Sequence, residues 1–419
     1  MNKLFIRGGK RLTGEISVHG AKNSVLPLLS ATILSAGESV LHNCPVLSDV
    51  EIACEILECL GCTVKREGAT LIVNTSHLKQ TQIPECLMTE MRSSIVFLGA
   101  LLARTGRARV NFPGGCEIGQ RPIDLHLQAL RQMGVVIEEE HGFLNCTAPD
   151  SIKGTSISLS FPSVGATENI MLAACTAEGE TVIHNAAGEP EIVDLANYLV
   201  SCGAKIRGAG ENTIYIQGVS SLHSVEHTVI ADRIVASSYL CAAAVTRGEV
   251  LLHNVQTTHL SGVLPLLEEA GCRIVSGKTS IYMNAPSRPK AIRLLRTMPY
   301  PGFPTDAQPI LMAVTAIGDG TSVFIENIFE NRFKHVGEFI KMGANIKLEG
   351  RVAIVEGVEE LSGANLKATD LRGGAALIIA ALSAKGESRI SELQHIDRGY
   401  EKVELALGKL GADIQRIDE

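Results

Sequence analysis

One cysteine lies in a glycine-rich segment, between glycines and a charged residue. The segment reads PGGCEIGQR, so Gly114 and Gly115 precede Cys116 and Glu117 follows it. A thiol on such a loop can approach a substrate closely and deliver a proton, which typically accelerates a reaction by about 10²- to 10⁴-fold. The commoner role of a free cysteine is that of a small buried apolar side chain. The glycines and the glutamate favour exposure instead, and we expect Cys116 to act as a general acid.

Polar and charged residues recur at a second kind of position, the predicted start of an apolar helix. They are Lys22 with Asn23, Arg92, Ser163 with Gly165, Asp232 with Arg233, Asp306, and Asp370 with Arg372. A helix start offers free backbone N–H groups and a partial positive charge, so it is suited to binding phosphate or carboxylate. Each residue alone could equally be a helix cap or a solvated surface charge. Their recurrence at one structural position favours a binding function for the set.

Loops that follow the next predicted strands add further candidates. They carry Asp49, Cys116 with Arg121, Arg332 and Arg398. If these loops and the helix starts face one another, their cations form one basic cleft in a chain whose net charge is -7. We expect that cleft to contain Lys22, Arg92, Arg121, Arg332, Arg372 and Arg398. Such a cleft would suit polyanionic substrates.

Internal repetition indicates which elements position these residues. A helix that ends at a glycine and is followed by a Val/Ile-rich strand occurs six times, at a spacing of about 70 residues. The glycines are Gly61, Gly134, Gly203, Gly271, Gly343 and Gly411. Glycine adopts the left-handed conformation that ends a helix, and the residues that follow favour a strand. The sequence therefore predicts six copies of one supersecondary unit.

A second helix in each copy is apolar on nearly all faces, as in AALIIAALSA, which predicts that it is buried with the strands outside it. The fold class is thus α/β, with two inside-out barrel-like domains of three βαβαββ units each. The first domain is expected to span 22–229, and the second to combine 1–21 with 230–419. The early strand LTGEISV resembles the strands that precede later helices, and we expect it to complete a sheet of the second domain.

Composition excludes several classes of function. A net charge of -7 gives no basic surface for nucleic acid or an anionic membrane, and a chain without Trp is a poor stacking platform for single strands. The N-terminus has no signal-peptide pattern, and the longest apolar runs fall far short of the roughly 20 residues of a membrane span. Eleven scattered cysteines fit a reducing compartment, so we expect a cytoplasmic protein. Cys59 and Cys62 could be half of a metal or redox site, but packing explains them better.

Eight blocks of the chain, in order, resemble the UDP-N-acetylglucosamine 1-carboxyvinyltransferase family, and the resemblance covers essentially the whole chain. They are RGGKRLTGEISVHGAKNS, PGGCEIGQRPIDLH, SVGATENIMLAA, GEPEIVDLANYL, FPTDAQ, ENRFKHVGE, ATDLRGGAAL and HIDRGYE. The resemblance implies the enolpyruvyl transferase fold, with the active site between two domains. It implies that the enolpyruvyl group of phosphoenolpyruvate moves to the 3′-hydroxyl of UDP-N-acetylglucosamine, the first committed step of peptidoglycan precursor synthesis. No cofactor or metal is expected, since arginines would neutralise the phosphates.

The resemblance also implies roles for individual residues. The catalytic set would be Cys116, which the epoxide fosfomycin alkylates in the family, with Asp306, Lys22 and Arg398. Phosphoenolpyruvate would bind to Lys22, Asn23, Arg121 and Arg398. UDP-N-acetylglucosamine would bind to Asn23, Arg92, Arg121, Pro122, Ile123, Asp124, Leu125, Ser163, Val164, Gly165, Asp306 and Ile328. Supporting positions would be Asp49, Arg332, Asp370 and Arg372, although pairs Arg332–Glu330 and Asp370–Arg372 could equally be structural.

The sequence also allows two alternative functions and departs from the family pattern at three positions. The shikimate-pathway relative, 5-enolpyruvylshikimate-3-phosphate synthase, shares the fold but lacks the PGGC loop and reads G-S-K-S where this chain has GAKNS. An inactive paralogue that only binds the nucleotide sugar is a further alternative. Gly188, Val235 and Ser237 stand where the family commonly has Arg, Glu and Gly, which bears on sugar-nucleotide contacts and domain hinging. The sequence does not define the oligomeric state.

Overall fold

The computed structural model describes residues 2–112 and 123–418, and they form two compact units. The N-terminal unit comprises residues 20–112 and 123–230, and the C-terminal unit comprises residues 2–19 and 231–418. The chain therefore passes between the units after residue 19 and again after residue 230. The repeat pattern places these crossings after residues 21 and 229.

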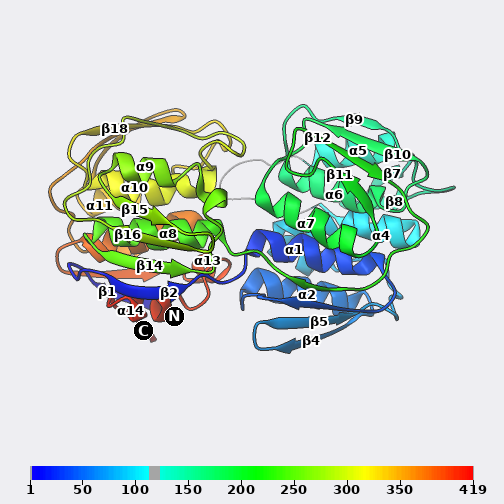
Figure 1. Cartoon of the computed structure of the whole chain (residues 1–419), viewed down its shortest axis with the longest axis horizontal. Helices are drawn as coiled ribbons and strands as arrows, with labels where there is room; N and C mark the ends of the chain where they lie inside the picture. Colours follow the sequence, from blue (N-terminus) through cyan, green and yellow to red (C-terminus); the bar gives the residue numbers. More distant parts are fainter. Residues whose placement is uncertain (1, 113–122, 419) are drawn as a thin grey trace. The chain divides into compact units, whose positions relative to one another are not determined.

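The N-terminal unit alternates helices with short strands (Figure 1). Its helices are α1 Lys22–Ala31, η1 Thr32–Leu34, α2 Ser48–Cys59, α3 Glu85–Glu90, η2 Arg92–Val96, α4 Phe97–Thr105, α5 Asp124–Gln132, α6 Val164–Ala174 and α7 Pro190–Ser201. Its strands are β3 Glu38–His42, β4 Thr63–Glu67, β5 Thr70–Asn74, β6 Arg107–Asn111, β7 Val136–Glu140, β8 Phe143–Thr147, β9 Ser156–Ser158, β10 Glu180–His184, β11 Lys205–Arg207, β12 Thr213–Gln217 and β13 Glu226–Thr228.

The C-terminal unit follows the same alternation. Its helices are α8 Arg233–Val245, η3 Thr257–Leu260, α9 Leu264–Glu269, η4 Thr305–Ala307, α10 Gln308–Ala316, α11 Val336–Lys341, α12 Leu371–Ser383, α13 Gln394–Asp397 and α14 Val403–Lys409. Its strands are β1 Asn2–Arg7, β2 Thr13–Ser17, β14 Glu249–His253, β15 Arg273–Ser276, β16 Ser280–Asn284, β17 Leu294–Arg296, β18 Thr321–Ile325, β19 Asn345–Glu349, β20 Val352–Glu356, β21 Asn365–Lys367, β22 Glu387–Ser391 and β23 Asp413–Asp418.

Apolar helices form the centre of each unit. In the C-terminal unit α8, α10 and α12 contact one another, and Figure 1 shows α8 and α10 lying inside the surrounding strands. In α12, 11 of 13 residues are buried, because its sequence is apolar on every face. The N-terminal unit repeats the arrangement with α1 and α6 both against α4. Each unit has its own hydrophobic core, which confirms the inside-out arrangement that the apolar helices predict.

The sheets show how a repeat is closed. In three of them a short edge strand and a central strand pair in parallel, and the chain between the two contains a buried helix: β9–α6–β10, β17–α10–β18 and β21–α12–β22. Two antiparallel strands then complete the sheet, as in the order β17-β18-β20-β19. A parallel pair needs such a crossover, which explains the buried helix in each unit.

Two strands are exchanged between the two units. β2 lies directly before α1 in the sequence, yet it pairs in parallel with β14, from Thr13↔Glu249 to Ser17↔His253. β13 lies before α8, yet it pairs in parallel with β3 of the N-terminal unit. The pairing of β2 confirms that LTGEISV completes a sheet of the second domain. It also explains the two crossings between the units that lie within the described residues, after residues 19 and 230.

The six repeat glycines end their helices in the left-handed conformation. Their φ angles are 97°, 89°, 102°, 96°, 91° and 93° in chain order. A side chain with a Cβ rarely adopts this conformation, so glycine is favoured at each position. The prediction made from the repeat is therefore confirmed at all six sites.

The Cys59–Cys62 pair has one buried and one exposed member. Cys62 is buried, as packing predicts, and burial raises its pKa to about 11. Cys59 is exposed at the end of α2, so the packing interpretation is wrong for that residue.

Within residues 2–112 and 123–418 no three His, Cys, Asp or Glu side chains are grouped so that they could hold a metal ion. No helix in these ranges is long and apolar enough to cross a membrane.

Candidate active site

The start of α1 in the N-terminal unit carries a buried ion pair. Lys22 is the first residue of α1 and donates to Asp49 Oδ2 from Nζ at 3.0 Å. Both side chains are almost entirely buried, 11% exposed for Lys22 and 1% for Asp49. The residue before the helix, Ala21, has no side-chain oxygen that could cap the first N–H groups. An uncapped helix start with a lysine beside it is suited to binding an anion.

A second polar cluster, which the sequence did not reveal, supports the same turn of α1. Ser24 donates its hydroxyl to Asp194 Oδ2, and His227 Nε2 lies 2.9 Å from Asp194 Oδ1. Ser24 is two residues from Lys22 and one from the half-buried Asn23. Asp194 lies on α7, some 170 residues away in the chain, so no local pattern could have linked it to α1.

The start of α6 brings the predicted nucleotide-binding residues next to α5. Ser163 caps α6, because its Oγ accepts from Ala166 N at 3.3 Å. A Cβ added at Gly165 would lie 3.2 Å from Cε1 of His126, so this glycine leaves room for the ring. His126 Nδ1 lies 3.0 Å from Asn169 Nδ2 of α6. His126 was not among the predicted residues, although it directly follows them in RPIDLH.

The structure describes some of the remaining predicted substrate-binding residues of the N-terminal unit. Asp124 is the first residue of α5 and is exposed, and Leu125 after it is half-buried. Ile123 directly precedes the helix and is buried. Val164 is the first residue of α6, and Arg92 is the first residue of η2, which leads into α4. Three predicted site residues, Cys116, Arg121 and Pro122, lie outside the described residues.

In the C-terminal unit, two arginines hold the carboxylate of Asp306. Arg332 Nη2 donates to Asp306 Oδ1 at 2.8 Å, and Arg372 Nη2 donates to Asp306 Oδ2 at 3.1 Å. The arginines are 2% and 4% exposed, whereas the Asp306 side chain is 26% exposed. Burial lowers the pKa of Arg372, but the negative charges of Asp306, Tyr400 and Asp232, together with the hydrogen bond to Asp306, outweigh burial and raise this pKa above the ordinary value. The pair therefore favours the ionised carboxylate.

Asp306 does not cap the helix that follows it. It lies in η4, and no side chain caps α10. The alternative in which Asp306 is a structural N-cap is therefore wrong, because its oxygens are occupied by Arg332 and Arg372. Asp370, in contrast, is a cap: its Oδ1 accepts from Arg372 N and Gly373 N, both at 3.0 Å.

The ion pair considered between Arg332 and Glu330 is not formed. Glu330 lies 3.4 Å from Arg351, while Arg332 turns inward to Asp306 and lies 3.9 Å from Asp370. A buried guanidinium needs buried acceptors, and the exposed Glu330 cannot supply one. The Asp370–Arg372 contact is likewise a bond to the backbone N–H of Arg372, so it is a helix cap and no side-chain ion pair.

A fully buried histidine lies beside this cluster. His335 precedes α11, and burial lowers its pKa to about 4, with Asp370 raising it and Arg332 lowering it. It is therefore neutral at neutral pH.

Two further predicted residues lie in loops of the C-terminal unit. Arg398 follows α13 and is half-buried. Ile328 lies in the loop after β18, where its N–H donates to Glu326 Oε1 at 2.8 Å. Glu326 was not among the predicted residues.

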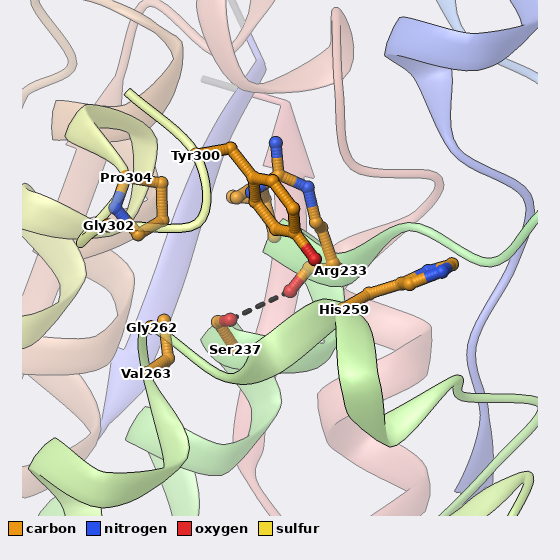
Figure 2. A pocket seen from close by; sticks show the side chains of 9 residues that line it. Arg233, Ser237, His259, Gly262, Val263, Tyr300, Gly302 and Pro304 are labelled. Atoms are coloured by element: carbon orange, nitrogen blue, oxygen red, sulfur yellow. Dashed lines mark hydrogen bonds between the residues drawn. The ribbon is translucent and has the colours of Figure 1, made fainter. Parts of the chain in front are cut away.

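The unusual residues of α8 pack inside the C-terminal unit. Val235 is fully buried in its core. Figure 2 shows Ser237 in the wall of a small pocket, with its hydroxyl donating to Arg233 O at 2.7 Å and with Tyr300 beside Arg233. The hydroxyl thus bonds its own helix. Gly188 lies in the N-terminal unit. A Cβ added there would lie 3.2 Å from the carbonyl oxygen of Gly210, so a larger residue would require a small displacement of the neighbouring backbone.

Comparison with known proteins places this fold in a class. A family model described as EPSP synthase (3-phosphoshikimate 1-carboxyvinyltransferase) matches residues 6–407. The crystal structure of the enolpyruvyl transferase NikO from Streptomyces tendae has a TM-score of 0.89 and 26% identity, covering 99% of this chain and 98% of that chain. EPSP synthase from Acinetobacter baumannii shares the fold, with a TM-score of 0.78, 19% identity and coverage of 99% and 100%. The fold is that of the enolpyruvyl transferases, as the sequence predicts.

Curated relatives define the family within that class. UDP-N-acetylglucosamine 1-carboxyvinyltransferase 2 of Caldanaerobacter subterraneus subsp. tengcongensis is 54% identical over 417 residues, with 100% of both chains covered. UDP-N-acetylglucosamine 1-carboxyvinyltransferase of Geobacter metallireducens is 47% identical over 419 residues, again with 100% of both covered. The chain belongs to the UDP-N-acetylglucosamine 1-carboxyvinyltransferase family.

Proposed function

We propose that this enzyme transfers the enolpyruvyl group of phosphoenolpyruvate to the 3′-hydroxyl of UDP-N-acetylglucosamine and releases inorganic phosphate. This is the first committed step of peptidoglycan precursor synthesis. Full-length identity of 54% to a relative of that name supports the assignment. The structural observation that carries it is the Asp306 carboxylate, which Arg332 and Arg372 hold at 2.8 and 3.1 Å while it remains partly exposed.

The reaction is an addition followed by an elimination. Cys116 donates a proton to the methylene carbon of phosphoenolpyruvate, and the neighbouring carbon acquires oxocarbenium character. The sugar 3′-hydroxyl adds to that carbon and gives up its proton, which forms a tetrahedral intermediate. Loss of inorganic phosphate, and of one proton from the new methyl group, restores the carbon–carbon double bond.

Phosphoenolpyruvate brings a phosphate and a carboxylate, and both need cations. We assign these anions to Lys22, Arg121 and Arg398, with Asn23 beside them. No side chain caps the start of α1, so its backbone N–H groups and partial positive charge next to Lys22 suit the phosphate. Arginine suits the planar carboxylate, because its guanidinium can donate two parallel hydrogen bonds.

UDP-N-acetylglucosamine is assigned to the other predicted positions. Asp306 accepts a hydrogen bond from the 3′-hydroxyl, either as the general base or as the group that orients it. Two buried arginines on its oxygens favour the ionised form, which is the form that both roles require. The nucleotide is assigned to Asn23, Arg92, Arg121, Pro122, Ile123, Asp124, Leu125, Ser163, Val164, Gly165 and Ile328. We place this reaction in the cytoplasm.

Phosphate release from phosphoenolpyruvate tests the proposal directly. Release should require UDP-N-acetylglucosamine, and it should stop after fosfomycin treatment in the wild-type enzyme. Release that is independent of the sugar nucleotide would overturn the proposal, as would binding of the nucleotide with no release. Shikimate 3-phosphate serves as the alternative acceptor, and full activity of Cys116→Ser with that acceptor would favour the shikimate-pathway reaction.

A further inference from the structure

We propose that Glu326 is a positioning residue that fixes the turn carrying Asp306 against the loop carrying Ile328, and so sets the site for the sugar nucleotide. The inference rests on the proposed roles of Asp306 and Ile328. Glu326 itself is completely buried at the end of β18, with 0% exposure, so it cannot contact the substrate as the structure stands.

The carboxylate of Glu326 accepts hydrogen bonds from three separate segments. Its Oε1 accepts from the backbone N–H groups of Ile328 at 2.8 Å and Phe329 at 3.0 Å. The same oxygen accepts from the hydroxyl of Thr297, at the end of β17, at 3.0 Å. Its Oε2 accepts from the hydroxyl of Thr305, in η4, at 3.0 Å. One side chain therefore holds together its own loop, the end of β17 and η4.

Thr305 transmits this constraint to Asp306. Its carbonyl oxygen accepts from Arg332 Nε at 3.1 Å and from Arg332 Nη2 at 3.0 Å, and Nη2 also donates to Asp306. Glu326 thus fixes the side chain of Thr305 while Arg332 fixes its backbone. Asp306 is the next residue in the chain, so its carboxylate can move little unless Thr305 moves.

An acidic residue is favoured at position 326 because a carboxylate has acceptor sites for all four donors. A buried charge is costly unless hydrogen bonds satisfy it, and two N–H and two O–H groups do so here. A short loop held through two successive N–H groups has a defined conformation. The backbone of Ile328, and hence its side chain, is therefore placed relative to η4.

Loss of Glu326 should affect one substrate much more than the other. Asp306 and Ile328 are assigned to UDP-N-acetylglucosamine, whereas phosphoenolpyruvate is assigned mainly to Lys22, Arg121 and Arg398. A displacement of about 1 Å at a reacting group can reduce turnover by up to about 100-fold. In Glu326→Ala we expect the KM for UDP-N-acetylglucosamine to rise about tenfold or more, with a fall in kcat. The KM for phosphoenolpyruvate should change less than about twofold.

Conservative variants separate positioning from general stability. In Glu326→Gln the amide oxygen can replace Oε1, and the NH₂ group can donate to the Thr305 hydroxyl. The KM of this variant for UDP-N-acetylglucosamine should therefore lie much closer to the wild-type value than that of Glu326→Ala. Thr305→Val removes only the bond to η4 and should raise the KM for the sugar nucleotide in the same direction as Glu326→Ala. Glu349→Ala is the control, since Glu349 is an exposed carboxylate on β19 of the same sheet.

The outcomes are distinguishable. An unchanged KM for UDP-N-acetylglucosamine in both Glu326→Ala and Thr305→Val, with only a lower melting temperature, would overturn the positioning role. If Glu326→Ala does not fold, Thr305→Val and Glu326→Gln still decide the question. A wild-type enzyme that releases phosphate without the sugar nucleotide would instead refute the proposed function.

Discussion

Arg332 and Asp306 form a 2.8 Å ion pair in which the arginine is 2% exposed and the carboxylate is 26% exposed. The guanidinium of Arg332 is thus fixed inside the protein, while part of the Asp306 side chain remains accessible. Arg372 holds the second oxygen at 3.1 Å, so the carboxylate plane is also fixed. This geometry favours a carboxylate that accepts a hydrogen bond from a substrate hydroxyl in one defined direction.

Asp306→Asn should therefore impair catalysis much more than binding. The amide keeps the size of the carboxylate but is a much weaker acceptor for a developing proton, and it places an NH₂ group against one arginine. We expect kcat to fall by about 10²- to 10⁴-fold, the usual contribution of such proton transfer. Steady-state phosphate release and calorimetric titration with UDP-N-acetylglucosamine would measure the two effects separately.

Asp319→Asn is the matched control, because Asp319 is an exposed carboxylate after α10 in the same unit. It should leave both measurements unchanged. A kcat within about threefold of wild type in Asp306→Asn would show that Asp306 has no essential role in catalysis, since that is well below the usual acid–base contribution.

The Lys22–Asp49 pair allows a separation of stability from function. Lys22→Met alone removes the lysine of the pair, while Asp49, which is 1% exposed, stays buried. Breaking a buried pair in this way costs about 3 to 5 kcal/mol, so the free energy of unfolding should fall by about that amount. The double variant Lys22→Met/Asp49→Leu removes both charges and should recover much of the lost stability.

Activity should not recover in that double variant, because the cation assigned to phosphoenolpyruvate is still missing. Urea unfolding and phosphate release, measured on the wild type, the single variant and the double variant, would test this. A double variant with wild-type activity would assign Lys22 a purely structural role.

His335 predicts a loss of stability at acid pH. Burial lowers its pKa to about 4, and the charges of Asp370 and Arg332 act on it in opposite directions. An unfolded histidine has a pKa of about 6.5, so between these values the unfolded chain binds more protons than the folded one. The stabilising contribution is therefore fully present above about pH 6.5 and is lost as the pH falls through about 4.

His335→Leu removes this titration. Its free energy of unfolding should decline less between pH 7 and pH 4 than that of the wild type, with a difference on the order of 1 to 3 kcal/mol. His77→Gln is the control at an exposed histidine and should follow the wild-type curve. A His335→Leu curve parallel to the wild type would contradict the lowered pKa.

The sequence predicted the features of this fold that depend on local physics. A glycine that ends a helix has a left-handed backbone wherever it stands, and six such glycines defined six repeats. An apolar helix must be buried, and six buried helices defined the inside-out arrangement. The place of β2 in a sheet of the C-terminal unit followed from the same repeat, because the strand resembled those that precede later helices, whereas its partner β14 came from the structure.

Side-chain partners were less predictable, because they come from segments far apart in the chain. Arg332 was considered a partner of Glu330, two positions away, but the folded loop directs it to Asp306. Asp194 lies within the block GEPEIVDLANYL and Glu326 lies in no quoted block, but the roles of both depend on donors from distant segments of the chain. A residue is predictable from the sequence where the backbone conformation requires one residue type, as at the six glycines. It is least predictable where a buried carboxylate accepts hydrogen bonds from hydroxyl groups far away in the chain.

Glu168 predicts the opposite pH dependence in the N-terminal unit. It lies on α6 and is 7% exposed, and its pKa is raised well above the ordinary value by burial and then by Glu191 and Glu189. The folded state therefore binds the proton more tightly than the unfolded state, whose carboxyl has a pKa of about 4.3. The stabilising contribution is fully present below that value and is lost as the pH rises through the folded pKa.

Glu168→Gln carries no proton to lose. It should match the wild type near pH 4 and exceed its stability increasingly as the pH rises, by about 1 to 3 kcal/mol, the usual range for a polar group buried away from water. Glu58→Gln, at an exposed position on α2, is the control and should change the unfolding curve little at any pH. Chemical unfolding followed from pH 4.5 to pH 9 would decide the matter, and a Glu168→Gln variant less stable than the wild type at pH 9 would show that the ionised carboxylate is needed.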